Sequence, residues 1–260
     1  MLKNINFIKT NPFYIFEVEN FLDKNLYEGL KLNFPKIYNT NNNLDVFKNG
    51  KFGFDTSSLL YQSTLNSNQY VKRLHDVVYS EDFFKFFYSN LYFKFLLSRK
   101  SNIKHILKLL RKPKLVDKIN KSSLKYYLNF KTEMKIEIQY SFIENGGKIV
   151  PHTDSGEKLL SLMLYFPDYE NDNTNIKYLE SSYGTSFWKS KKENFNNKHQ
   201  EGDSEKLFIN DKSNKIIYKS KFEGNKLLGF IKNPYSWHSV DPVNISSNYI
   251  RKSININFYF

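Results

Sequence analysis

The sequence predicts an α+β fold that is mainly β: a β-sandwich or barrel with a layer of helices packed on one of its sheets. Two observations carry this prediction. Apolar residues recur with helical spacing between residues 68 and 112, and from residue 125 onward they alternate with polar residues as strands do. Short strands preceded by helices are typical of a β core that is covered by helices on one face.

We expect a single domain over residues 1–260. The chain is long enough to bury a substantial core, and 40% of its residues are hydrophobic. No internal repeat and no clear linker divides it. Residues 1–125 are then mainly helical support, and residues 126–260 form the β core.

The elements of the first half follow from local patterns. Residues 13–18 predict a strand, and residues 24–33 predict an amphipathic helix for which Asp23 is a suitable N-cap. Residues 39–56 are rich in Asn, Gly and Lys and predict a loop. Residues 68–112 predict three helices, the second capped at Ser80 and the third ending before Pro113.

In the second half, apolar residues recur at every second position, which is typical of strands. Residues 145–147 (Asn-Gly-Gly) predict a turn between two strands, and residues 171–175 and 189–204 predict polar loops. The predicted strands are Glu133 to Phe142, Ile149 to Asp154, Lys158 to Phe166, Ile176 to Leu179, Lys206 to Ile209, Lys215 to Tyr218, Lys226 to Ile231 and Ile250 to Phe260.

Composition excludes several classes of site. Cysteine is absent, so disulfides, zinc–thiolate sites, iron–sulfur clusters and cysteine nucleophiles are excluded. No run of eighteen apolar residues predicts a transmembrane helix, and the first residues do not resemble a signal peptide. We therefore expect a cytoplasmic protein.

The formal charge of +13 would suit a nucleic-acid partner, but the composition offers another reason for it. The chain has no alanine and only four arginines, whereas Lys, Asn, Ile, Phe and Tyr are abundant, which is typical of AT-rich codon usage. We interpret most of the charge as solvated surface. A membrane-surface or RNA-binding role for the aromatic and lysine-rich residues 83–112 is the alternative to their packing on a sheet.

The candidate metal ligands begin with His152 and Asp154. Residues i and i+2 of a strand point to the same face, so both side chains can reach one metal ion. A lone His-x-Asp is weak evidence, and a half-buried histidine bonded to Asp154 is the structural alternative. Two imidazoles and one carboxylate without thiols would suit Fe(II) with open coordination positions.

The second histidine must come from His75, His105, His199 or His238. His75 and His105 lie on predicted helices as surface or packing residues, and His199 lies in a polar loop. A strand followed by a tight turn delivers His238, which is the preorganised support that a metal ligand needs. His238 is therefore the predicted third ligand.

The last predicted strand carries the candidate anion site. Arg251, Ser253, Asn255 and Asn257 share one face of it, opposite a largely apolar face. A buried arginine beside a hydroxyl suits a carboxylate, whereas an isolated strand would more commonly turn this polar face to solvent.

These residues resemble the pattern of the Fe(II)/2-oxoglutarate-dependent oxygenases, in particular the prolyl-hydroxylase-like group. That pattern is His-x-Asp, a distant His, and an Arg-x-Ser beyond it, and here it spans residues 152–154, 238 and 251–253. The likeness covers about residues 130–260. Its departures are the spacing of 251 − 238 = 13 residues and the lack of the usual Gly-Gly pair, which is either replaced by Asn173-Thr174-Asn175 or shifted to Gly184.

The resemblance implies a double-stranded β-helix (jelly-roll) core. It implies that His152, Asp154 and His238 bind Fe(II), and that Arg251, with Ser253, binds the distal carboxylate of 2-oxoglutarate. Tyr140 is a further candidate for that pocket. Such enzymes use O2, convert 2-oxoglutarate to succinate and CO2, and hydroxylate a C–H bond of a substrate.

Within that family, Asp154 argues against halogenases, which have a small residue there. Nucleic-acid demethylases have a second arginine after the first, and this chain has none, so we expect no nucleic-acid substrate. A protein side chain or a glycan is favoured because long polar loops could line a wide cleft. The alternatives are a non-catalytic jelly-roll binding module and a basic protein that binds anions or nucleic acid.

Overall fold

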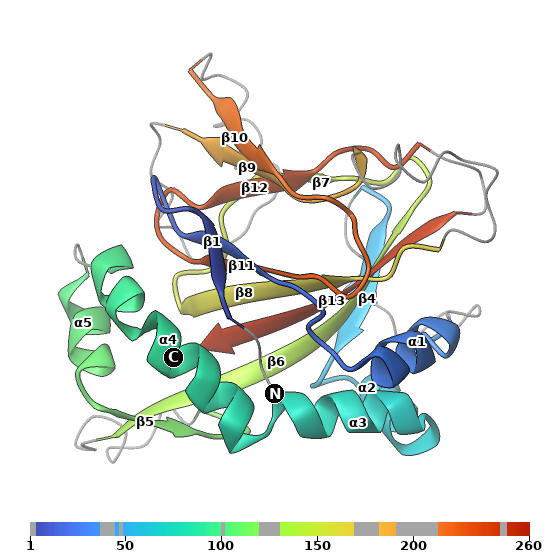
Figure 1. The fold of residues 1–260 in the computed structure, drawn as a ribbon, viewed down its shortest axis with the longest axis horizontal. Helices are drawn as coiled ribbons and strands as arrows, with labels where there is room; N and C mark the ends of the chain where they lie inside the picture. Colours follow the sequence, from blue (N-terminus) through green and yellow to red (C-terminus); the bar gives the residue numbers. More distant parts are fainter. Residues whose placement is uncertain are drawn as a thin grey trace.

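Two antiparallel sheets and a set of N-terminal helices form the molecule, as a computed structural model shows (Figure 1). The structure describes residues 4–36, 45–46, 49–99, 102–119, 131–168, 182–190, 213–244 and 249–260. The predicted strands at 176–179 and 206–209, the loop at 171–175 and all but two residues of the loop at 189–204 lie outside these ranges. No helix in the described ranges is long and apolar enough to cross a membrane.

The larger sheet contains most of the strands. Its order is β1-β2-β11-β8-β13-β6-β4-β3, and β5 pairs with β6 in parallel. The bounds are β1 Asn6–Lys9, β2 Ile15–Val18, β3 Asp45–Val46, β4 Lys51–Asp55, β5 Lys112–Leu115, β6 Lys131–Glu144, β8 Lys158–Tyr165, β11 Leu227–Ile231 and β13 Ile250–Tyr259.

The smaller sheet faces it and has the order β10-β9-β12-β7. Its bounds are β7 Ile149–His152, β9 Ser186–Lys189, β10 Lys215–Lys219 and β12 Trp237–Val240. Counted from β6 to β13 as one to eight, the core strands lie in the orders 6-3-8-1 and 5-4-7-2, which is jelly-roll connectivity. The predicted jelly-roll core with its helical layer is confirmed.

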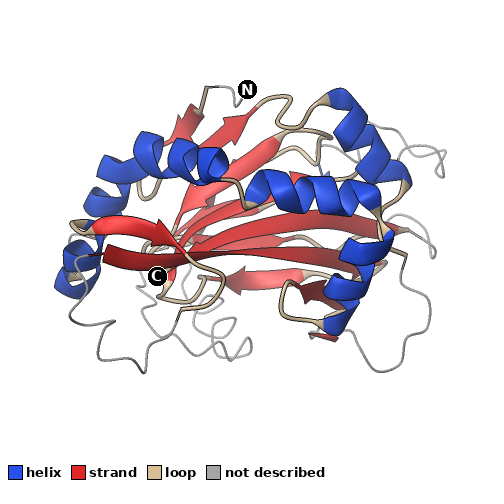
Figure 2. Ribbon diagram, turned by 90° about the horizontal axis from the view of Figure 1, so that it is seen from below, coloured by secondary structure: helices blue, strands red, loops and turns tan. Residues whose placement is uncertain are grey.

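The helices cover the outer face of the larger sheet (Figure 2). They are α1 Lys24–Leu32, α2 Leu59–Ser67, α3 Gln69–Val78, α4 Glu81–Ser98 and α5 Ile103–Leu109. The predicted caps are confirmed: the Asp23 carboxylate accepts a hydrogen bond from the Leu26 amide, and the Ser80 hydroxyl accepts one from the Phe83 amide. Helix α2, which the helical spacing did not predict, begins at the N-cap Ser58.

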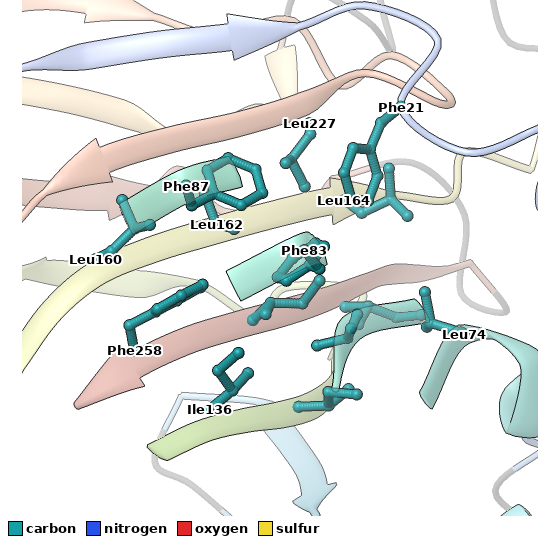
Figure 3. Close-up of a cluster of buried hydrophobic side chains, with 14 of the residues drawn as sticks. Phe21, Leu74, Phe83, Phe87, Ile136, Leu160, Leu162, Leu164, Leu227 and Phe258 are labelled. Carbon is teal, nitrogen blue, oxygen red and sulfur yellow. The ribbon is translucent and has the colours of Figure 1, made fainter. Parts of the chain in front are cut away.

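Aromatic packing joins the helices to the sheet. Phe83 and Phe87 of α4 lie against Phe258 of β13, with centroid separations of 6.1 Å for both pairs (Figure 3). Leu160 and Leu162 of β8 extend the same cluster. The prediction that the aromatic residues of this helix pack on a sheet is therefore correct for its buried face.

The loop predicted at residues 39–56 is wrong for two strands, β3 at residues 45–46 and β4 at residues 51–55. Residues 51–55 were expected in a loop, but they form β4, which pairs with β6. Phe52 stacks on Phe142 with an interplanar angle of 2°. Gly53 is required there, because an added Cβ would lie 2.3 Å from the Tyr140 carbonyl oxygen. Gly53 therefore marks a position where two strands of a sheet approach each other closely, and it does not mark a loop.

Candidate metal and anion site

Strand pairing brings the two histidines together. His152 ends β7 and His238 lies on β12, and the two residues are direct partners in the register of the smaller sheet. Their ring centroids are 4.3 Å apart. With the Asp154 carboxylate they form a group in which one ligand atom from each residue lies within 4.8 Å of the others. The structure thus brings the three predicted ligands to one place.

Asp154 reaches this group from a loop and not from a strand. The predicted strand from Ile149 to Asp154 ends at His152, so the i and i+2 argument does not place the carboxylate. Its Oδ1 accepts a hydrogen bond from Lys158 Nζ at 2.8 Å, and its Oδ2 accepts one from Ser161 Oγ at 2.8 Å. Both partners lie on β8, so two side chains of the strand that follows the loop orient this carboxylate.

Both imidazoles are oriented in the same way. His152 Nδ1 lies 2.9 Å from the Val150 carbonyl oxygen, and His238 Nδ1 lies 3.0 Å from the Ser236 carbonyl oxygen. A carbonyl oxygen only accepts, so Nδ1 carries the proton in each ring and Nε2 carries the lone pair. This arrangement is the usual support of a metal-bound histidine.

Burial and charge set the protonation states that a metal needs. Burial lowers the pKa of His238, which favours the neutral imidazole. Burial alone would raise the pKa of the Asp154 carboxyl, but the Lys158 ammonium, which is the largest opposing cause, holds it well below its ordinary value. A neutral His238 and an ionised Asp154 at neutral pH are the forms that bind a divalent cation.

The three side chains open into a cavity of about 90 Å³ between the two sheets. The polar face of β13 lines this cavity, which answers the open question of where that face points. The lining residues include Lys51, Gln139, Ser141, Lys158, Ser161, Met163, Tyr165, Thr185, Phe230, Val240, Arg251, Ser253, Asn255 and Asn257.

Arg251 is a buried cation of this cavity and is only 2% exposed. Its Nε donates to the Tyr183 carbonyl oxygen at 2.8 Å, and its Nη1 donates to Ser253 Oγ at 3.4 Å. The guanidinium lies 5.1 Å from the ring centroid of Tyr165 and 4.9 Å from that of Phe222. Within the described ranges no Asp or Glu forms an ion pair with it, so its charge is available to an acidic ligand.

Tyr140 does not belong to this cavity. Its ring packs in the core on the helix side of the larger sheet, 5.0 Å from that of Phe54 and 5.4 Å from that of Phe34. Its neighbours on β6, Gln139 and Ser141, line the cavity instead. The alternation of side chains along a strand explains the difference of one residue.

The other histidines remain apart from the group. His75 Nδ1 lies 2.9 Å from the hydroxyl of Tyr61 on the helix side of the molecule. His105 is buried beside Arg99, with 3.3 Å between its Nδ1 and Nη1 of the arginine. His199 lies outside the described residues.

Sequence reasoning missed two polar partners of the site. Ser161 and Lys158 were read only as part of a strand, yet both contact the Asp154 carboxylate. Lys158 could have been singled out by its position four residues after Asp154. In a chain so rich in lysine, however, that spacing alone does not distinguish a buried lysine from an exposed one.

Comparisons with known proteins give structural matches only. No family model and no curated protein matches the chain. A prolyl-4-hydroxylase from Pseudomonas putida matches at 11% identity, covering 95% of this chain and 93% of its own, with a TM-score of 0.43. An oxidoreductase of the 2OG-Fe(II) oxygenase family from Burkholderia pseudomallei matches at 7% identity, with coverages of 94% and 84% and a TM-score of 0.44.

HygX from Streptomyces hygroscopicus, in a structure with nickel, 2-oxoglutarate and hygromycin B bound, matches at 6% identity. The match covers 94% of this chain and 82% of that protein, with a TM-score of 0.41. The structure therefore matches those of 2OG-Fe(II) oxygenases across nearly the whole chain, at low sequence identity.

Proposed function

We propose that this chain is an Fe(II)- and 2-oxoglutarate-dependent dioxygenase that hydroxylates a C–H bond. One observation carries the proposal: a single cavity contains two imidazoles, a carboxylate and a buried guanidinium that pairs with no carboxylate in the described ranges. The first three groups suit a divalent metal. The fourth suits an acidic co-substrate, which a simple metal site would not need.

His152, Asp154 and His238 would hold the iron on one face. Zn²⁺ accepts the same donors, but the described residues add no fourth His, Asp or Glu to the group, which leaves positions open, as redox use of Fe(II) with O2 requires. The hydrogen bonds from Nδ1 of both rings to carbonyl oxygens fix the imidazoles before metal binds. This preorganisation lowers the entropy lost on binding.

Arg251 and Ser253 would hold the distal carboxylate of 2-oxoglutarate. The aromatic rings of Tyr165 and Phe222 flank the guanidinium, and they limit the access of water to it. An ion pair formed there is strong because the surroundings are poorly solvated. When bound, iron and 2-oxoglutarate would activate O2, so that one oxygen atom enters succinate as CO2 leaves and the other enters the C–H bond of the substrate.

The substrate we favour is a protein side chain or a glycan. Three amides from two strands, those of Gln139, Asn255 and Asn257, line the same cavity. Amides donate and accept hydrogen bonds, so they suit the hydroxyl and amide groups that sugars and peptides present. No carboxylate besides Asp154 lines the cavity within the described ranges, which is compatible with a neutral or acidic substrate.

Thermal unfolding with ligands tests the proposal. In the intact protein, Fe(II) under anaerobic conditions and 2-oxoglutarate should together raise the melting temperature by several degrees, because both bind only the folded state. His152→Ala should lose the shift with either ligand. The matched control His75→Ala, on α3, should keep it.

A second variant separates the two ligands. Arg251→Met should keep the shift caused by Fe(II) alone and lose the further shift caused by 2-oxoglutarate. Succinate release in the presence of peptides, glycans and small metabolites then identifies the substrate. An intact protein that gives no shift with Fe(II) and 2-oxoglutarate would instead be a non-catalytic jelly-roll binding module.

A further inference from the structure

Helices α4 and α5 expose a set of large apolar side chains that we call the α4–α5 surface. It consists of Phe93 and Leu97 on α4, Ile103 and Leu107 on α5, and Leu110 just after α5. Each of these side chains is between 55% and 75% exposed. In Figure 1 the two helices lie together at one end of the molecule, beside β5.

The spacing shows that these exposed residues form stripes. Phe93 and Leu97 are four residues apart, as are Ile103 and Leu107, so each pair lies on one face of its helix. The opposite faces are buried: Leu91 and Phe95 in α4 are at most 1% exposed. Helix α4 therefore has one apolar face in the core and a second one that is open to solvent, and α5 buries Leu109 while it exposes Ile103 and Leu107.

The same segment carries mainly positive charge. Residues 81–117 contain seven lysines and two arginines, and their three acids, Glu81, Asp82 and Asp117, lie at the two ends of this stretch.

We propose that the α4–α5 surface binds an anionic lipid bilayer. A bilayer interface takes up apolar side chains, and its acidic headgroups attract lysine and arginine, so this partner uses both properties of the surface. Nucleic acid would use the charge but not five exposed apolar side chains. A second copy of the chain would place the exposed cations of this surface against the same cations of its partner, because a twofold interface pairs identical surfaces.

Contacts connect this surface to the candidate metal site. At the end of α4, Arg99 donates to the carbonyl oxygens of Gly156 and Lys158, in the segment that follows Asp154. Lys108 of α5 pairs with Glu157 at 3.3 Å. A protein docked through α4 and α5 would therefore hold this segment close to the membrane surface, whatever reaction the site performs.

Sedimentation with lipid vesicles tests the proposal. The full chain should bind vesicles of equimolar phosphatidylcholine and phosphatidylglycerol at least tenfold more tightly than vesicles of phosphatidylcholine alone. Each Lys or Arg near an anionic bilayer strengthens binding about fivefold. Binding should weaken as salt is raised, because salt screens the attraction between exposed charges and headgroups.

Two double variants test the two properties separately. Leu97→Gln with Leu107→Gln should weaken binding to the anionic vesicles at least fivefold. The matched control, Leu32→Gln with Leu59→Gln, changes leucines of α1 and α2 that are 75% and 79% exposed and should leave binding unchanged. Since all four leucines are exposed, the variants should fold.

Lys104→Glu with Lys112→Glu should weaken binding at least tenfold, whereas Lys24→Glu with Lys215→Glu, which changes the net charge equally, should weaken it much less. Equal losses in the two charge variants would mean that only net charge matters, and would overturn the proposal. Equal binding to neutral vesicles would do the same.

Two further outcomes identify other partners. Tighter binding to polyuridylate than to anionic vesicles, lost in the charge variant but kept in the leucine variant, would assign the surface to nucleic acid. Concentration-dependent dimers that the leucine variant abolishes would assign it to a second copy of the chain. Either result would overturn the membrane proposal.

Discussion

Lys158 is the residue that most affects the chemistry of Asp154. Its ammonium lies 2.8 Å from one carboxylate oxygen, and both side chains are almost fully buried. Burial would lower the pKa of Lys158, but the Asp154 carboxylate raises it, so the ion pair is charged at neutral pH. A divalent metal bound by Asp154 would therefore share one carboxylate with a second cation, and the two cations repel each other.

Replacing Lys158 by methionine should destabilise the protein without metal and tighten metal binding. The variant leaves a buried carboxylate without its cation, which costs about 3–5 kcal/mol of the free energy of unfolding. A divalent metal can replace the lost charge, so the increase in melting temperature with Fe(II) or Co(II) should be larger than in the intact protein, and the metal Kd at least tenfold lower. Loss of stability that metal does not restore would show that Lys158 is needed to position Asp154.

At the residue scale the sequence predicted which residues meet in the cavity better than it predicted their surroundings. His152, Asp154, His238 and Arg251 follow one another in an order that resembles a family pattern, and all four line one cavity. Tyr140 was predicted in the cavity, but its neighbours Gln139 and Ser141 line it instead. The alternating side chains of β6 define two faces of the strand, but they do not show which face meets the smaller sheet. That assignment depends on packing between sheets, which no local pattern contains.

At the scale of elements, the end of α4 supports the segment that carries Asp154. Arg99 is 5% exposed, and it donates to the carbonyl oxygens of Gly156 and Lys158. It also lies beside His105 of α5, where burial first and the Arg99 charge second lower the pKa of His105 to about 4. One side chain thus joins two helices to the loop of the site.

Arg99→Met should raise the pKa of His105 toward its ordinary value, because one of the two main causes of its depression is removed. Amide protection in residues 155–159 should fall, and the free energy of unfolding should drop by about 3 kcal/mol, since charged hydrogen bonds are lost. Histidine NMR titration and hydrogen exchange measure these effects. The control Arg73→Met removes an exposed ion pair with Asp23 and should change neither. An unchanged His105 pKa would contradict the assigned role.

Elements with a clear apolar period were predicted closely, and the exceptions have physical reasons. Helix α3 and strand β8 follow their patterns to within a residue at most ends. Strand β4 was missed because three of the residues before it and within it are Asn and Gly, which also occur in turns. Pairing with β6 and aromatic stacking on that strand outweigh this local preference.

At the scale of the whole molecule, closure of the jelly roll creates the site. His152 and His238 are 86 residues apart in sequence (238 − 152), and they become register partners only when β7 and β12 pair. The larger sheet brings Arg251 on β13 to the same cavity. The sequence could suggest these residues through a family likeness, but their meeting depends on sheet topology.

Lys232 connects this fold to the pH dependence of stability. It lies just after β11, is 3% exposed, and donates to the Asn233 carbonyl oxygen at 3.0 Å. Burial lowers its pKa to about 7, whereas a lysine of the unfolded chain titrates at about 10.4. Between these values the unfolded chain binds more protons, so the contribution of Lys232 to stability rises with pH by about 1.4 kcal/mol per unit.

Lys232→Met should therefore be more stable than the intact protein at and below pH 7, because methionine carries no charge to bury. The difference in the free energy of unfolding should shrink steadily from pH 7 and become small near pH 10, where the lysine is neutral in both states. Urea unfolding of the metal-free protein at several pH values measures it, with the exposed Lys24→Met as the control. A difference that does not change with pH would mean that Lys232 stays charged in the folded protein and has a partner for its ammonium.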